Sequence, residues 1–369
     1  MTKKYSCGSM PVQMSRRFLL TGATASVTTL TLGLHVPNLH AQTVPPKLAA
    51  KLSTVATFPK PYFLENLTVR KDNSLLVTVL NKKELWYVPP AGAQQQVAPV
   101  LLHTFSQPAT GILEAEPDVF YICTSNVFTT HESYLHRLDL RDWRLGTPVA
   151  PIEVLKFPAS AGALNGCCLL TPTVVLVADS IAGLLWQVDL APKNGRPEAR
   201  VWLKHDSMAL IPDNPVPNQP GINSAHYAAQ TSHLYYTSTA QMLFMRVRVD
   251  PTTLEPAGTP ELVARGRMWD DFCIDEGAGV AYITTHRQNT IDRISLDPGK
   301  NNGPRLSVAG EPFTDELIGP SSVAWGRGPN EYGRFAYAIT DGGLTAPRDG
   351  LVREARVLRI EFSPLEISK

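Results

Sequence analysis

The chain has 369 residues, of which 34 are Lys or Arg and 33 are Asp or Glu, so its formal net charge at pH 7 is +1. Charges of both signs are mixed along the sequence, which excludes the basic balance of a nucleic-acid-binding protein and the polybasic segment of a membrane-surface protein. We therefore expect a small-molecule substrate as the partner, with no nucleic acid and no stable membrane insertion, and a monomer. The 31 Pro and 25 Gly residues suit a fold with many turns.

Residues 1–41 are predicted to be a signal peptide of the twin-arginine type and not part of the fold. Arg16 and Arg17 precede the apolar stretch 18–36, and a small-residue cleavage point follows. Glycine, threonine and histidine interrupt the stretch, which argues against a permanent transmembrane helix. An arginine pair in an ordinary secretory signal is the alternative. The mature chain, 42–369, is expected to be a single domain that is exported to the periplasm or secreted.

The rest of the chain repeats a unit of three short apolar segments, each of strand length. The clearest copy spans 163–190, where the segments 167–170, 174–178 and 184–190 are separated by turn-forming residues. Related units open at Glu65, near Gly111, and at Asn223, Asp270 and Ser321. Strand-built units repeated at this spacing indicate a β-propeller, in which no unit can bury its faces alone.

A fourth strand is predicted after every unit except the last, in the segments PVLLHTF, PIEVLKF, EARVWLK, PELVARG and RLSVAG. The sixth unit has none because the chain ends soon after RIEF, whereas a spare strand, KLSTVATF (51–58), stands before the first unit. We expect this N-terminal strand to complete the last blade and close the ring, which leaves only short protected edges. The predicted fold class is all-β, a six-bladed β-propeller.

Four of the units begin with an oxygen-bearing side chain in the same phase of the repeat: Glu65, Asn165, Asn223 and Asp270. Each stands just before a predicted innermost strand, and the same alternation of apolar residues follows it. Because innermost strands surround the axis of a propeller, residues in one phase should meet at one mouth of its channel. Two carboxylates and two amide oxygens suit a hard divalent cation. The alternative is that these residues cap turns by bonding their own backbone.

A second phase of polar residues stands at the ends of the second strands: Asn126, Asp179, His286 and Asp341. We expect these residues near the axis as well, and we take Asp179, His286 and Asp341 as candidate substrate-binding residues. His226, on an inner strand, is a further candidate. A structural role is the alternative for both histidines. The sequence contains no Gly-rich phosphate loop and no nucleophile elbow of the G-x-S-x-G type.

The pattern of Glu-x-apolar at Glu65, Asn-Gly at Asn165, Gly-x-Asn at Asn223 and Asp-x-apolar-Cys-Ile-Asp at Asp270 resembles a known family. This is the senescence marker protein/gluconolactonase/luciferin-regenerating-enzyme group of six-bladed propellers. The resemblance implies a divalent cation on the axis, held by Glu65, Asn165, Asn223 and Asp270, with calcium expected first and magnesium, manganese or zinc as alternatives. It also implies lactone hydrolysis, with Asp270 as the acid/base. Asp271 would replace Asp270 as ligand if the register slipped by one, and the apolar alternation favours Asp270.

The chain departs from the sugar lactonases of this group, because Ala163 and Gly166 stand where those enzymes often carry Arg and Asp. Details such as Leu-Asn-Gly, Asp-Asp-Phe and Gly-Pro-Ser-Ser are more similar to a divergent branch common in fungi and bacteria. Apolar residues are expected at the same mouth: Phe63, Leu64, Leu164, Tyr227 and Trp269.

We therefore predict a metal-dependent hydrolase of a rather apolar lactone or ester. The alternatives are a non-hydrolytic cyclase of the hetero-Diels–Alder type in natural-product biosynthesis, and a binding propeller with a structural metal.

Overall fold

The computed structural model describes residues 50–92, 95–127, 129–192, 195–216, 219–301, 306–310 and 317–362. The chain divides into two units, Met1–Pro45 and Pro46–Lys369, and the first unit lies outside the described residues. The predicted signal peptide, 1–41, falls in that part. Within the described residues, no helix has the length and apolar character needed to cross a membrane.

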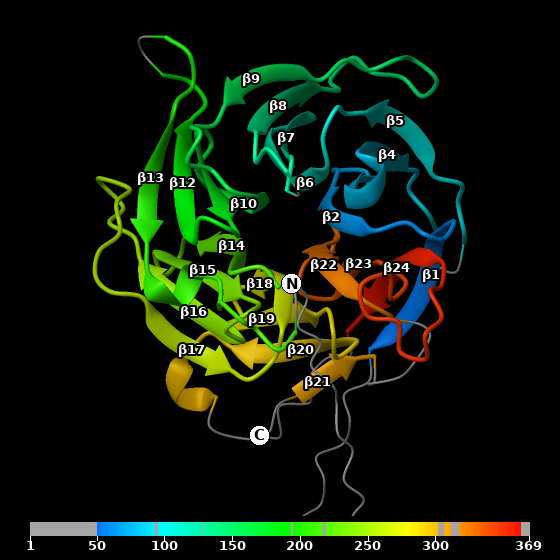
Figure 1. The fold of residues 1–369 in the computed structure, drawn as a ribbon. Coiled ribbons are helices and arrows are strands. Elements are labelled where there is room, and N and C mark those ends of the chain that lie inside the picture. The colour runs from blue at the N-terminus through cyan, green and yellow to red at the C-terminus, as the bar shows by residue number, and fades with distance from the viewer. Residues whose placement is uncertain are drawn as a thin grey trace, which may run out of the picture. The chain divides into compact units, whose positions relative to one another are not determined.

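The second unit is a ring of six antiparallel sheets of four strands each (Figure 1). Blade 1 comprises β2 (Leu64–Val69), β3 (Leu75–Val79), β4 (Glu84–Val88) and β5 (Val100–Thr104). Blade 2 comprises β6 (Ala109–Glu116), β7 (Val119–Ser125), β8 (Ser133–Asp139) and β9 (Ile152–Lys156). Blade 3 comprises β10 (Leu164–Thr171), β11 (Val174–Asp179), β12 (Leu184–Asp189) and β13 (Ala199–Lys204).

Blade 4 comprises β14 (Ile222–Ala228), β15 (His233–Ser238), β16 (Leu243–Arg248) and β17 (Glu261–Arg265). Blade 5 comprises β18 (Trp269–Asp275), β19 (Val280–Thr285), β20 (Thr290–Ser295) and β21 (Leu306–Ala309). In these blades the first strand is innermost, because the first strands of neighbouring blades pack against one another around the ring.

Blade 6 closes the ring by joining the two ends of the unit. Its strands run in the order β1 (Lys51–Phe58), β24 (Ala355–Glu361), β23 (Phe335–Thr340) and β22 (Pro320–Trp325), with β1 on the outside. β1 pairs antiparallel with β24 from Lys51 opposite Glu361 to Phe58 opposite Ala355. The prediction of a six-bladed propeller closed by its N-terminal strand is therefore confirmed.

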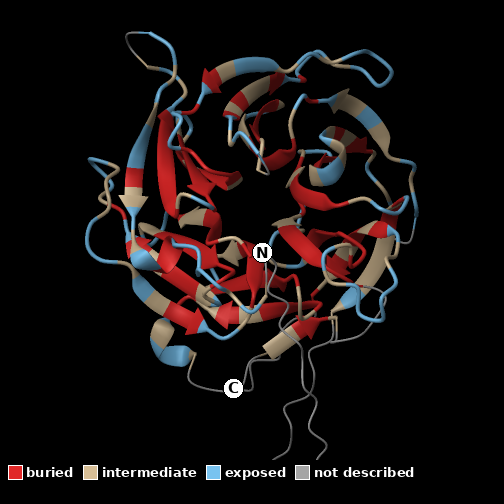
Figure 2. Cartoon of the chain, in the orientation of Figure 1, coloured by how far each residue is buried: buried red, intermediate tan, exposed pale blue. Residues whose placement is uncertain are grey.

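The hydrophobic core lies between the blades. In β11, Val175 and Val177 belong to a cluster shared with blade 2, whereas Leu176 and Ala178 belong to one shared with blade 4. Successive side chains of a strand point to opposite faces of its sheet, so each blade contributes to two clusters. Buried residues accordingly concentrate on the inner and middle strands, and exposed ones on the outer strands and loops (Figure 2).

Each innermost strand is irregular at the same place. The pairing register shifts between Leu64 and Asn66, Ala109 and Ile112, Leu164 and Cys167, Ile222 and Ala225, Trp269 and Phe272, and Pro320 and Ser322. The lead residues predicted to stand just before these strands are therefore inside them, as the second residue of each strand. A β-bulge bends the strand and re-aims a side chain, so the repeat sets the direction of every lead residue in the same way.

Candidate functional site

Threonines on the second strands hold three of the bulges in place. The main-chain N–H groups of Asn66, Ser224 and Asp271 donate to the hydroxyls of Thr78, Thr237 and Thr284 at 3.1, 3.2 and 3.1 Å. Each hydroxyl in turn donates to a main-chain carbonyl of the next blade, that of Thr110, Asp270 or Ser321. A donor that the bulge would leave unpaired is thus satisfied, and the bulges of neighbouring blades are tied together.

The two lead asparagines have their amide nitrogens committed within the wall. Asn165 Nδ2 donates to Ser180 Oγ at 3.1 Å, and Asn223 Nδ2 donates to Thr239 Oγ1 at 2.9 Å. Both hydroxyls then donate to the carbonyl of the residue before the next lead residue, at 2.7 and 2.6 Å. Neither side chain caps its own backbone, which was the alternative. With its nitrogen held in this way, each amide has its oxygen available to a ligand.

Glu65 and Asp270 bring two buried carboxylates to the same mouth, being 9% and 8% exposed. Burial, together with the charges of Asp271 and Asp341, raises the pKa of Glu65 to about 8. Burial and the charges of Glu65 and Asp271 raise the pKa of Asp270 well above its ordinary value, although a hydrogen bond from Asn223 opposes this. The site thus concentrates negative charge that a cation would stabilise.

His286 and Asp341 join this group, as predicted, from the ends of β19 and β23. His286 lies with Nε2 3.1 Å from Asp341 Oδ2 and with Nδ1 3.9 Å from Asp270 Oδ2. Burial alone would raise the pKa of Asp341, but the His286 ring and hydrogen bonds from the N–H groups of Gly343 and Thr345 hold that pKa below its ordinary value. Asp341 therefore orients the imidazole toward Asp270.

Asp271, next to Asp270, has a different environment. Its carboxylate accepts hydrogen bonds from three other inner strands: from Asn66 Nδ2 at 3.4 Å, Ser224 Oγ at 2.5 Å, His226 Nε2 at 2.8 Å and Ser322 Oγ at 2.6 Å. Although burial raises its pKa, His226 and the two hydroxyls bring that pKa below its ordinary value. With its oxygens occupied, Asp271 is a poorer candidate ligand than Asp270.

His226 faces another part of the channel. It borders a cavity of about 450 Å³ that is lined by residues beyond the bulges, among them Leu169, Tyr227 and Trp325. None of the four described lead residues lines this cavity. That His226 binds substrate stays a prediction, and the structure places its ring beside this cavity, bonded to Asp271, and not among the lead residues.

Asp179 was predicted to bind substrate, and this prediction is wrong. Its side chain is fully buried and accepts hydrogen bonds from the main-chain N–H groups of Gly162, Ala163 and Ala182 at 2.9 Å each, and from Trp186 Nε1 at 3.0 Å. These donors leave no free oxygen for a substrate. Asp179 holds the turn after β11 in shape. Asn126 likewise accepts a local bond, from the hydroxyl of Thr129 at 2.8 Å.

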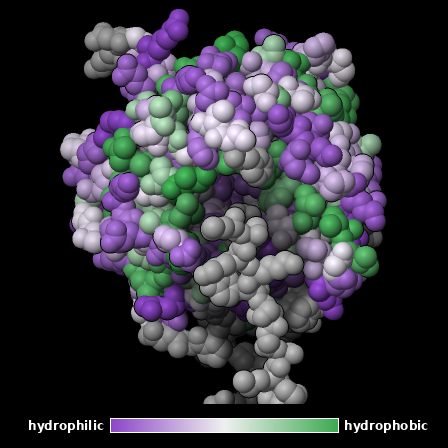
Figure 3. Space-filling model, viewed as in Figure 1, coloured by the Kyte–Doolittle hydropathy of each residue, from purple (hydrophilic) through white to green (hydrophobic). Residues whose placement is uncertain are grey.

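Most of the apolar residues expected at the mouth lie elsewhere. Leu64, Leu164 and Trp269 are at most 1% exposed and belong to the clusters between blades. Tyr227 lines the cavity beside His226. Only Phe63 contacts a residue of the site, with its ring centroid 5.6 Å from that of His286. On the face seen in Figure 3 the surface is hollowed at its centre, and both polar and hydrophobic side chains border the hollow.

The donor set fits a hard divalent cation. Glu65, Asp270 and the two asparagines supply oxygen only, which suits calcium, magnesium or manganese better than zinc. Among the described residues, no group of three or more His, Cys, Asp or Glu side chains is arranged to hold a metal ion. The predicted set has only two side chains of those types, since amides provide its other two donors.

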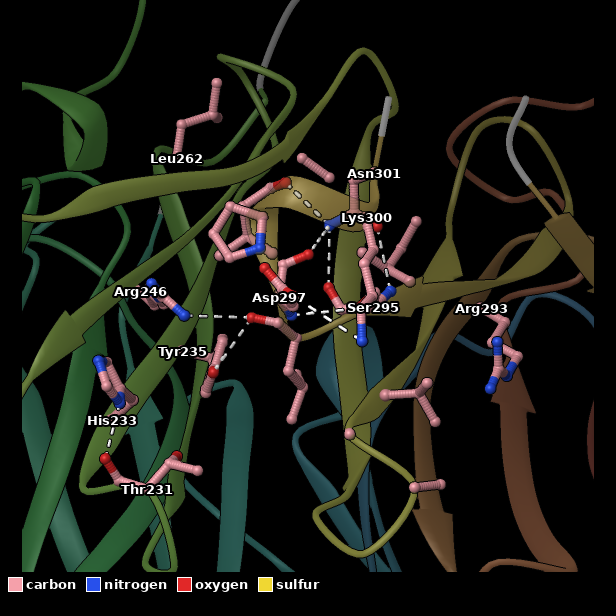
Figure 4. A pocket seen from close by; sticks show the side chains of 18 of the residues that line it. Thr231, His233, Tyr235, Arg246, Leu262, Arg293, Ser295, Asp297, Lys300 and Asn301 are labelled. Atoms are coloured by element: carbon pink, nitrogen blue, oxygen red, sulfur yellow. Dashed lines mark hydrogen bonds and ion pairs between the residues drawn. The ribbon is translucent and has the colours of Figure 1, made fainter. Parts of the chain in front are cut away.

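A cavity of about 1010 Å³ lies between blades 4 and 5 and is lined by residues of both (Figure 4). Arg246 in its wall is engaged with Glu261 at 2.8 Å and with the Leu296 carbonyl at 3.3 Å. Lys300 lies 3.9 Å from Asp297. The cavity also borders Leu306, beside residues that the structure does not describe. Arg246, Asp297 and Lys300 are thus engaged within the protein, whereas the buried Nε of Arg293 has no hydrogen-bond partner among the described residues. No site is assigned there.

No protein-family model and no curated protein matches this sequence. Among solved structures, the fold is similar to a luciferin-regenerating enzyme, with a TM-score of 0.59 and 14% identity over 85% of this chain and 95% of the other. A PQQ-bound aldose sugar dehydrogenase from Streptomyces coelicolor gives a TM-score of 0.55 at 12% identity over 86% and 100%. A calcium-binding regucalcin from Agrobacterium tumefaciens gives 0.55 at 14% over 84% and 97%. Likeness at these identities establishes the propeller fold alone, and function has to be argued from the site.

Proposed function

We propose that the protein is a hydrolase of a lactone or ester and that Glu65, Asn165, Asn223 and Asp270 hold a divalent cation, calcium first, at one mouth of the channel. One observation carries the proposal: two buried carboxylates with raised pKa values stand with two amides whose nitrogens are tied back into the wall. A cation bound there supplies positive charge that polarises a carbonyl group and makes water more acidic.

In this proposal Asp270 is the catalytic residue that accepts the proton of the attacking water. His286 is a positioning and relay residue, because Asp341 bonds its Nε2 and thereby turns Nδ1 toward Asp270. Asp270 is a buried carboxylate next to the proposed cation, a position from which it can accept a proton from water. Asp341 is fully buried and its oxygens already accept from Gly343, Thr345 and His286, so its role is to hold His286, the member of the pair that we propose contacts the substrate.

The family and the location belong to the same proposal. The order of the lead residues and the fold support membership of the senescence marker protein/gluconolactonase/luciferin-regenerating-enzyme group, in a divergent branch. The arginine pair at Arg16 and Arg17 supports export of the mature chain, 42–369, and the monomer is part of the proposal. Ala163 and Gly166 lack the charged groups that would grip a sugar acid, so we propose a substrate other than a sugar lactone.

The test compares Glu65→Gln and Asp270→Asn, each of which removes one negative charge from the proposed cage while keeping its size. Calcium affinity depends on ligand charge, so calorimetry should show weaker calcium binding by both variants than by the native protein. Turnover of a panel of lactones and esters should separate them. In excess calcium, Glu65→Gln should regain part of its activity, whereas Asp270→Asn should stay 10²- to 10⁴-fold below the native rate, roughly the contribution of a general base.

Asp142→Asn is the control, because it removes the same charge from an exposed position. It should match the native protein in both measurements. Unchanged calcium binding by both site variants would show that the four-residue cage is wrong. Calcium binding without turnover of any lactone or ester would reject the hydrolase and leave a binding propeller or a cyclase.

A further inference from the structure

The turns that hold the asparagine amides continue into exposed apolar side chains. Ile181 directly follows Ser180 and is 39% exposed, and Met242 lies three residues after Thr239 and is 42% exposed. The loop from blade 3 to blade 4 adds two more such residues, Leu210 at 37% and Ile211 at 40%. We call Ile181, Leu210, Ile211 and Met242 the apolar rim.

Hydrogen bonds join these three segments into one border of the mouth. The N–H of Gly221 donates to the Ser180 carbonyl at 3.0 Å, and the N–H of Thr239 donates to the Gly221 carbonyl at 3.0 Å. Gln241 Nε2 donates to the carbonyl of Ala209 at 2.9 Å, next to Leu210. The rim is therefore built on the same segments that position Asn165 and Asn223, and it stands beside them.

Met242 occupies a backbone conformation that normally selects other residues. The position just before the third strand has a positive φ in four blades, and it is filled by Lys83, Gly183, Met242 and Asn289, with φ of 62°, 66°, 54° and 57°. Gly and Asn adopt this left-handed conformation most readily. A methionine there, with 42% of its surface exposed, gives up local stability without filling a core.

The other side of the mouth is polar. Blades 5 and 6 contribute His286 and Asp341, and Arg287 Nη1 donates to the carbonyl of Thr345 at 2.7 Å. Four of the ten large hydrophobic side chains exposed in the described part of the chain belong to the apolar rim. The exposed rim over blades 3 and 4 thus carries apolar side chains, whereas blades 5 and 6 contribute the ionisable side chains of His286, Arg287 and Asp341.

We propose that the apolar rim binds an alkyl chain of the substrate, so that the substrate class is a lactone or ester with an unbranched tail of several carbons. This inference rests on the proposed hydrolase. The reacting carbonyl lies among Glu65, Asp270 and His286, and the tail lies across the rim toward Met242. An apolar chain gains roughly fourfold in affinity for each methylene removed from water. A six-carbon tail with half of its methylenes buried against the rim should therefore raise the affinity by more than about tenfold.

The test compares γ-butyrolactone with γ-decalactone, which differ by a six-carbon tail. The native protein should show a kcat/KM at least tenfold higher for γ-decalactone. Met242→Asn suits the left-handed turn and should fold. The double variant Met242→Asn/Ile211→Ser should lose the preference for γ-decalactone, while its turnover of γ-butyrolactone stays unchanged. Leu145→Ser is the control, because it removes an exposed leucine from blade 2. Thermal unfolding checks that all variants are folded, and Ile211→Ser alone serves if the double variant is not.

Binding gives a readout independent of turnover. In the Asp270→Asn background, calorimetry should show γ-decalactone binding that the rim substitutions weaken at least tenfold. If γ-decalactone binds in this rim-dependent way but no lactone is hydrolysed, the hydrolase is wrong and the apolar rim stands. If both lactones are hydrolysed equally well and the rim substitutions change nothing, the rim inference is wrong and the hydrolase stands.

Discussion

Two adjacent carboxylates, Asp270 and Asp271, face two different levels of the channel, the Asp270 level with the lead residues and the Asp271 level beyond the bulges. Their pKa values are shifted in opposite directions. The two carboxylates are almost equally buried, at 8% and 5% exposure. Asp271 receives four side-chain donors and has a lowered pKa, whereas Asp270 stands near Glu65 and has a raised one. Burial alone therefore does not decide the state of an inner carboxylate, and the partners that surround it do. At the Asp271 level, hydrogen bonds to the carboxylate hold the blades together. At the Asp270 level the carboxylates lack such donors, and a ligand is expected there.

The largest effect should come from removing the satisfied carboxylate. Asp271→Ala leaves the buried donors of Asn66, Ser224, His226 and Ser322 without their acceptor, and we expect a loss of about 3–5 kcal/mol in the free energy of unfolding. Asp270→Ala, measured without calcium, removes a carboxylate that its neighbours repel, and should leave stability unchanged or raise it. Urea unfolding in a chelator at pH 8 measures both. Equal destabilisation by the two substitutions would contradict the division into levels.

The pH dependence of stability should run in opposite directions for the two levels. Glu65 ionises near 4.5 in the unfolded chain but at about 8 in the folded protein, so the folded state binds more protons between these values. Stability of the calcium-free protein should therefore fall as pH rises from about 5 to 8, by about 1.4 kcal/mol for each unit of pKa difference at most. Asp271 has a folded pKa below 3.8, so its contribution should be present above that pH and be lost as the pH falls further.

Thermal unfolding from pH 3 to pH 9 gives both arms of this profile. Glu65→Gln should reduce the alkaline arm, to which Asp270 with its raised pKa also contributes, and leave the acid arm in place; calcium added at pH 8 should restore stability to the native protein. An alkaline arm that is the same in Glu65→Gln as in the native protein would assign it to another group.

The smallest effect should come from the hydroxyls behind the amides. Thr239→Val keeps the side-chain shape but removes the acceptor for Asn223 Nδ2 and the donor to the Trp269 carbonyl, at a cost of about 1–2 kcal/mol. Calcium binding should weaken as well, because the freed amide no longer presents its oxygen in a fixed direction. Thr252→Val, at an exposed position, should change neither quantity. Calorimetry and urea unfolding measure both quantities. Native calcium affinity in Thr239→Val would show that this hydroxyl has no role in calcium binding.

The propeller itself was predictable from the sequence because its signals are local. Strands alternate side chains between two faces, so the apolar period of two marks each strand, and turn residues mark the ends. The segment KLSTVATF is β1 with the predicted bounds, and its pairing with β24 follows from a surplus strand at one end and a deficit at the other. The phase of Glu65, Asn165, Asn223 and Asp270 was equally readable, because the same bulge recurs at that phase in every inner strand.

The environment of each inner side chain was decided only by the tertiary structure. The hydrogen bond between Asn66 and Asp271 joins residues 205 positions apart, and Ser322 reaches the same carboxylate from another blade. The apolar alternation favoured Asp270 as the ligand, but no local pattern shows which donors surround Asp271, or distinguishes an Asp179 filled by backbone donors from an Asp341 that orients a histidine. The sequence by itself determined the ring and the residues that approach its axis. Hydrogen-bond donors from other blades decide which of these carboxylates is stabilised in its charged form, and only ring closure brings those donors together.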